Sequence, residues 1–183
     1  MTLLRLILLF PGALVVVATT AVLAYDLFAF QPHRPDIDKL LAQAGADERA
    51  PPESLTRVLQ VAYAGNIDDH VARQLAQELL LEPARGNKLR WHGTNLLWSL
   101  LIKAHLSKRE RDTLFLSLSY MGNGQRGFQQ ASTSIVGVPL AEVSLSQAAT
   151  LVTVGKSPAS YLANPQRLAQ SAGHLAERAA SAP

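Results

Sequence analysis

The chain begins with a long apolar segment, residues 6–25. No charged side chain occurs from Leu6 to Tyr25, in LILLFPGALVVVATTAVLAY. About 20 helical residues at ~1.5 Å each reach ~30 Å, the thickness of a bilayer's hydrocarbon core. The run is long for the apolar part of a signal peptide, and no clear small-x-small cleavage site follows it. The pattern therefore predicts an uncleaved transmembrane anchor over residues 6–25. A cleaved signal peptide and a buried core helix are the alternatives.

Charges beside this segment indicate its orientation. Arg5 precedes the segment, whereas Asp26 follows it and Arg34 comes later. Because basic residues favour the cytoplasmic side of a membrane, residues 1–5 are expected in the cytoplasm and the body outside it. Prolines in QPHRP (31–35) cannot continue a helix, so residues 26–36 are expected to form a short stiff linker.

Residues 37–183 carry helical signals and no convincing alternating strand. Pro51-Pro52 predicts the start of a helix that ends near Gly65, and Asp68 or Asp69 can cap the next one, through about residue 81. Ser107 with Glu110 and Ser144 with Gln147 have capping-box spacing, and Asn164-Pro165 is another helix start. A long helix is predicted over 88–105, with a core face formed by Leu89, Leu96, Leu97, Leu100, Leu101 and Ala104. The Ala-rich residues 176–183 are expected to be a flexible tail.

Composition excludes several classes of chemistry. The 183 residues include no cysteine, which rules out disulfides and thiolate metal sites. The net charge of +3, with 17 basic and 14 acidic residues, is too small to indicate nucleic-acid binding. The five histidines show no metal-ligand spacing such as H-E-x-x-H. No metal, cofactor or nucleic acid is therefore predicted.

A glycine pattern in YMGNGQRG (120–127) fits G-x-G-x-x-G. A dinucleotide loop needs a strand before it and a helix after it in a βαβ unit. Here TLFLSLSY (113–120) continues the helix expected to begin after Ser107. The glycines are therefore interpreted as ending one helix and turning the chain tightly into the next.

Residues 106–168 fit a longer motif, SKdEIlelYLN-x-x-yfGnGayGI, followed by eLsl-x-EaAlLag-x-x-x-sP-x-x-Y-x-P. The residues in step with it are Ser107, Lys108, Tyr120, Gly122, Asn123, Gly124, Gly127, Ala131, Gly137, Leu145, Ala148, Ala149, Leu151, Pro158, Tyr161 and Pro165. In this motif the segment resembles the carboxyl-terminal half of the family 51 peptidoglycan glycosyltransferase domain, found in monofunctional transglycosylases and class A penicillin-binding proteins. Upstream, RQLAQELLL (73–81) resembles QQLAKNL, and PESLTRVL (52–59) resembles DP-x-g-x-x-RA. The resemblance covers residues 37 to 170 or so.

This resemblance implies an all-α, lysozyme-like transglycosylase helical domain over 37–175, behind one N-terminal transmembrane helix. It also implies tethering to the outer face of the bacterial inner membrane. The partners implied there are lipid II or a related lipid-linked saccharide and cell-wall synthesis proteins.

The residues that carry the family's chemistry are replaced. A carboxylate base is needed to deprotonate the acceptor hydroxyl, and its motif should fall within LLAQAGADER (40–49). Glu48 is the candidate base there, or else a solvated loop carboxylate. The family's second glutamate falls on Asn95, and the lysine of QQLAKN falls on Gln77.

Four residues remain candidates for substrate binding. Gln74 matches the family's second glutamine, with a helix-surface residue as the alternative. Lys88 and Arg90 could meet phosphate, or form a solvated face. Asn123 could bind ligand, although a left-handed turn is favoured for it.

Three hypotheses follow. The first is a transglycosylase-like protein that has lost polymerase chemistry and acts by binding. The second is an active, divergent polymerase with Glu48 as a relocated base. The third is a generic helical membrane-tethered adaptor whose resemblance is accidental.

Overall fold

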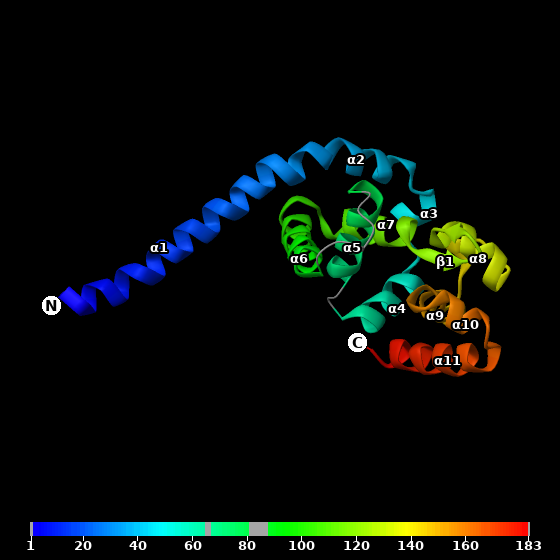
Figure 1. Cartoon of the computed structure of the whole chain (residues 1–183). Helices are drawn as coiled ribbons and strands as arrows, with labels where there is room; N and C mark the ends of the chain where they lie inside the picture. Colours follow the sequence, from blue (N-terminus) through cyan, green and yellow to red (C-terminus); the bar gives the residue numbers. More distant parts are fainter. Residues whose placement is uncertain (1, 65–66, 81–87, 183) are drawn as a thin grey trace. The chain divides into compact units, whose positions relative to one another are not determined.

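The computed structural model describes residues 2–64, 67–80 and 88–182, with side chains described from residue 12 onward except those of residues 88–90. The chain divides into two compact units, Met1–Asp38 and Lys39–Pro183. Figure 1 traces the helices of each unit along the chain.

The first unit is helical along its described length. Helix α1 spans Thr2–Tyr25 and is followed by a π-helical turn, Asp26–Phe30, and a 3-10 turn, Gln31–His33. Helix α2 then spans Arg34–Gln43. One helix here is long and apolar enough to cross a membrane, and its apolar side chains from Leu14 to Leu23 are largely exposed.

The prolines of residues 31–35 were expected to interrupt the helix, and this expectation is wrong, because the backbone is helical from Asp26 to Gln43. Pro32 lies in the first turn of the 3-10 segment, and Pro35 is the second residue of α2. Backbone N–H groups in a first turn have no partner within the helix, so proline is tolerated there.

The second unit is built almost wholly of helices, as the sequence predicts. Its helices are α3 (Ala46–Arg49), α4 (Glu53–Tyr63), α5 (Ile67–Leu79), α6 (Lys88–His105), α7 (Lys108–Leu118), α8 (Phe128–Val136), α9 (Leu145–Lys156), α10 (Pro158–Leu162) and α11 (Pro165–Ser181), with a 3-10 turn at Leu140–Glu142. The capping boxes of Ser107 and Ser144 and the side-chain cap of Asn164 are present. Helix α11 continues to Ser181, where a flexible tail was expected, because Leu175 and Ala179 are buried.

These helices pack in two groups. Helix α5 packs against α6 and α7, while α9 packs against α4 and α11 (Figure 1). Helix α8 contacts both α7 and α9, so it connects the two groups. The core of each group is formed by leucine, valine, alanine and aromatic side chains.

The glycine segment forms a short hairpin rather than a direct helix-to-helix turn. Strand β1 (Tyr120–Gly122) pairs antiparallel with β2 (Gln125–Arg126). Asn123 and Gly124, between the strands, have φ of 52° and 76°, a backbone that asparagine and glycine tolerate and that suits tight hairpins. Strands this short leave no alternating pattern in the sequence.

The packed face of helix α6 includes Leu101, as expected, but differs from the expected face elsewhere. Leu96 and Leu100 are 64% and 52% exposed. Trp98 and Ile102, spaced four residues apart, are fully buried, and Leu101 is buried beside them. A largely apolar helix offers more than one face, and the large Trp98 ring goes to the packed side.

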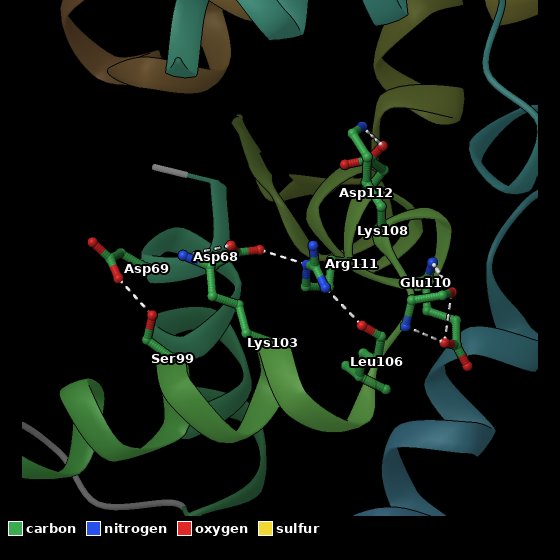
Figure 2. A network of polar contacts seen from close by, with 10 residues as sticks. Asp68, Asp69, Ser99, Lys103, Leu106, Lys108, Glu110, Arg111 and Asp112 are labelled. Carbon is green, nitrogen blue, oxygen red and sulfur yellow. Dashed lines mark hydrogen bonds and ion pairs between the residues drawn. The ribbon is translucent and has the colours of Figure 1, made fainter. Parts of the chain in front are cut away.

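A buried ion pair joins α5 to α7 (Figure 2). Asp68, expected as a helix cap, instead lies inside the first turn of α5 and is 5% exposed. Its Oδ1 is 2.6 Å from Nε of Arg111, as an ion pair without directed hydrogen-bond geometry. Lys103 Nζ of α6 is 3.4 Å from the other oxygen, and Arg111 donates to the Leu106 carbonyl at 2.6 Å. The pair therefore fixes the relation of α5, α6 and α7.

Candidate functional site

A pocket of about 270 Å³ lies among α5, α7, the hairpin and the α9–α10 junction, and we call it the central pocket. Helix α4 contributes Tyr63 to it. Its lining mixes polar and apolar side chains, and those with a charge or an imidazole are His70, Arg73, Glu78, Arg126 and Lys156.

Aromatic rings form one wall of the central pocket. The Tyr63 ring meets those of His70 and Phe115 edge to face, with centroids 5.1 and 4.9 Å apart. Lys156 Nζ is 5.2 Å from the centroid of the Tyr63 ring and donates to the Ala62 carbonyl at 3.3 Å. Burial raises the pKa of Tyr63 to about 12, so its phenol stays protonated at neutral pH.

Burial lowers the pKa of two basic side chains in the pocket, His70 and Lys156. Burial, the most important cause, lowers the pKa of His70, and the positive charge of Arg73 lowers it further; Asp69 opposes this, and Lys156 adds to it. Burial also lowers the pKa of Lys156. His70 is therefore neutral at pH 7, and the pocket disfavours additional positive charge.

Gln74 lies in this pocket, half-buried rather than on a free helix surface. Its Nε2 donates to Ser119 Oγ at 3.1 Å, and Ser119 in turn donates to the Phe115 carbonyl at 2.6 Å. The Gln74 Oε1 atom accepts no hydrogen bond from the described residues.

An ion pair crosses one side of the pocket. Arg126 Nη1 of β2 is 2.6 Å from Glu78 Oε2 of α5, and the two side chains are 59% and 37% exposed. Nothing local in the sequence marks either residue, because the pair joins segments 48 positions apart.

Glu48 lies in a second, neighbouring pocket of about 300 Å³, which we call the flanking pocket. The alternative of a solvated loop carboxylate is wrong, since Glu48 is 4% exposed. Its Oε2 accepts from the Gly45 amide at 2.9 Å, and its Oε1 accepts from the Gln129 amide at 3.0 Å, in the first turn of α8. The carboxylate thus stabilises a helix N-terminus, where negative charge is favoured.

The other expected site residues lie elsewhere. Asn95, in α6, donates to the Trp91 carbonyl at 3.0 Å and does not line the central pocket. Asn123 is exposed at the hairpin tip, in the left-handed turn favoured for it. The side chains of Lys88 and Arg90 lie outside the described residues. The described part of the chain contains no group of three His, Asp or Glu residues that could hold a metal ion.

The sequence model of the transglycosylase family matches residues 70–180, more than half of the chain. This chain belongs to the transglycosylase family. The matched range contains every lining residue of the central pocket named above except Tyr63, and it begins after Glu48. The fold is the lysozyme-like helical fold of this family.

Two penicillin-binding proteins are similar to this transglycosylase domain. Penicillin-binding protein 2a of Streptococcus pneumoniae is 41% identical over 63 residues, 34% of this chain and 9% of that protein. Penicillin-binding protein 1A of Pseudomonas aeruginosa is 24% identical over 143 residues, 77% of this chain and 17% of that protein. The chain therefore spans less than a fifth of the length of either relative.

Proposed function

We propose that this transglycosylase-family chain binds a lipid-linked saccharide such as lipid II and is impaired in glycan polymerisation. One observation carries the proposal. The central pocket combines Arg73, Arg126 and Lys156 with amide side chains, and the carboxylate among its described lining residues, Glu78, is paired with Arg126. In the ligand-free chain the site therefore has groups for holding a ligand, and its described carboxylate is engaged with Arg126.

The binding half of the proposal is supported by the chemistry of the lining. Arginine and lysine form charge-assisted hydrogen bonds with phosphate oxygens. Gln74 and Gln77 offer amide groups that suit sugar hydroxyls and acetamido groups. Tyr120 is 51% exposed beside them and offers an aromatic face for a sugar ring.

The proposed loss of polymerase activity is supported by the hydrogen bonds of the candidate base, Glu48. A general base must reach the proton that it removes. Both Glu48 oxygens accept backbone N–H groups, which hold the carboxylate at α8. Asn95 carries an uncharged amide at the other position where the family has a glutamate, and an amide cannot take up a proton as a carboxylate does.

The placement in the cell is part of the same proposal. The apolar helix α1 and the similarity to penicillin-binding proteins are consistent with a single-pass anchor over residues 6–25. We place residues 1–5 in the cytoplasm and the 37–175 domain outside it, at the bacterial inner membrane.

The test is lipid II binding and lipid II polymerisation by the detergent-solubilised full-length protein, beside an active family enzyme. We expect binding without glycan product. The control is Glu142→Gln, which changes an exposed carboxylate within the matched range and should leave binding unchanged.

One observation favours the second candidate, an active polymerase with a relocated base. Glu48 lines the flanking pocket, which shares Arg126 and Leu118 with the central pocket. Glycan product that disappears in Glu48→Gln would establish this candidate and contradict impairment.

The adaptor hypothesis loses its premise of accidental resemblance, because the chain belongs to the family. Absence of both binding and product would direct the search to cell-wall synthesis proteins as partners.

A further inference from the structure

The central and flanking pockets are neighbours, and we call the residues that line both of them the partition. Both are lined by Arg126 and Leu118, and they measure about 270 and 300 Å³. Leu118 ends α7, while Arg126 belongs to β2, so the partition is made where the hairpin meets that helix.

The polar part of this partition is held by a single ion pair. Glu78 Oε2 of α5 is 2.6 Å from Nη1 of Arg126, and both residues line the central pocket. Both side chains are more than one-third exposed. An exposed pair of this kind contributes only ~0–1 kcal/mol, so a ligand anion can compete with Glu78 for the guanidinium.

The two pockets offer similar chemistry on either side of Arg126. The flanking pocket is lined by Gln43, Gln129, Gln130 and Ser117, together with Glu48, whose carboxylate already accepts two backbone N–H groups. The central pocket is lined by Gln74, Gln77 and Ser119. Side-chain amides and hydroxyls both donate and accept hydrogen bonds, as a row of sugar hydroxyl and acetamido groups requires. Arg126 is the cation that faces both.

We propose that the two pockets form one saccharide groove in which Arg126 is the specificity-determining residue. An oxyanion of the lipid-linked saccharide, either a carboxylate or the diphosphate, replaces Glu78 as the partner of Arg126. A guanidinium recognises either oxyanion through paired N–H donors. Glu78 then acts as an internal competitor that weakens binding of every anionic ligand. This inference rests on the proposed saccharide-binding function.

The experiment measures lipid II affinity for the detergent-solubilised full-length protein and its Glu78→Gln, Arg126→Gln and doubly substituted variants. Removing the competitor in Glu78→Gln should raise affinity by roughly threefold, the scale of one exposed ion pair. Arg126→Gln should lower it by at least that factor. In the double variant the gain from Glu78→Gln should vanish, since no guanidinium remains to be released.

The matched control is Glu53→Gln, which breaks another exposed carboxylate–arginine pair, with Arg57, outside both pockets. Its affinity should equal that of the unchanged protein. Because Glu78→Gln is expected to bind more tightly, misfolding cannot imitate the result.

Competition identifies the source of the oxyanion. Inorganic pyrophosphate and a hyaluronan tetrasaccharide, which carries sugar carboxylates, are each titrated against bound lipid II, with neutral chitotetraose as reference. Chitotetraose should displace lipid II equally well from the unchanged protein and from Glu78→Gln. The anionic competitor that displaces lipid II more readily from Glu78→Gln than from the unchanged protein carries the recognised group.

Two results would overturn the inference while leaving the proposed function standing: unchanged affinity in Glu78→Gln, or a gain that persists without Arg126. Failure of the unchanged protein and of Glu78→Gln to bind lipid II at all would overturn the proposed function, and this inference with it.

Discussion

His70 makes the stability of the second unit sensitive to acid. Burial and the charges of Arg73 and Lys156 lower its pKa below the usual 6.5, against the opposing effect of Asp69. Between the lowered pKa and 6.5, the unfolded chain binds more protons than the folded chain. The free energy of unfolding should therefore fall as the pH drops below about 6.5, and level off once the folded protein is protonated too.

The measurement is the thermal unfolding midpoint of the full-length protein between pH 5 and 7.5. His70→Gln should flatten the decline at the acidic end, because it removes the titrating ring. His174→Gln, at an exposed histidine of α11, should retain it. An equal decline in both variants would show that another group carries the acid sensitivity.

At the residue scale, the sequence indicated which residues lie near the pocket better than it indicated how buried they are or what they contact. Gln74 was placed in the site because its neighbours in RQLAQELLL match a family motif. The burial of Glu48 was not predictable, since its partner Gln129 is 81 positions away. Contacts of that kind are set by tertiary packing, on which a local motif gives no information.

Helix α6 shows how packing decides between two apolar faces. We expect Trp98→Ala to destabilise the protein by ~3–5 kcal/mol, because a fully buried indole is removed and a cavity remains. Leu96→Ala, at a 64% exposed position of the same helix, should cost no more than ~0.5 kcal/mol. Urea unfolding of the full-length variants checks both values. Comparable losses would mean that the leucine face is packed after all.

At the element scale, the helix ends were the most predictable features. Ser107, Ser144 and Asn164 cap helices as their spacing indicates, because a cap depends on residues only three positions apart. Two features were not predictable. The hairpin at 120–126 has strands too short for periodicity, and Asp68 belongs to a pair with a distant residue.

For the molecule as a whole, the first segment decides where the domain works. The full-length protein should stay with membranes during alkaline carbonate extraction, because α1 offers a long uninterrupted apolar surface. A variant lacking residues 2–25 should be released. Release of both forms would contradict the proposed anchor. Protection of the 37–175 domain from protease added to inside-out vesicles would agree with the proposed side of the membrane.

The buried ion pair between Asp68 of α5 and Arg111 of α7 also affects the order in which these two residues can be replaced during evolution. If Arg111 is replaced first, Lys103 remains 3.4 Å from Asp68 and can still neutralise it. Figure 2 shows the Asp68 carboxylate in ion pairs with both Arg111 and Lys103, so replacing Asp68 first leaves both cations without this partner. Breaking a buried pair costs ~3–5 kcal/mol, whereas exchanging both charges for apolar residues can be neutral. We therefore expect descendants that lose the pair to have replaced the arginine before the aspartate.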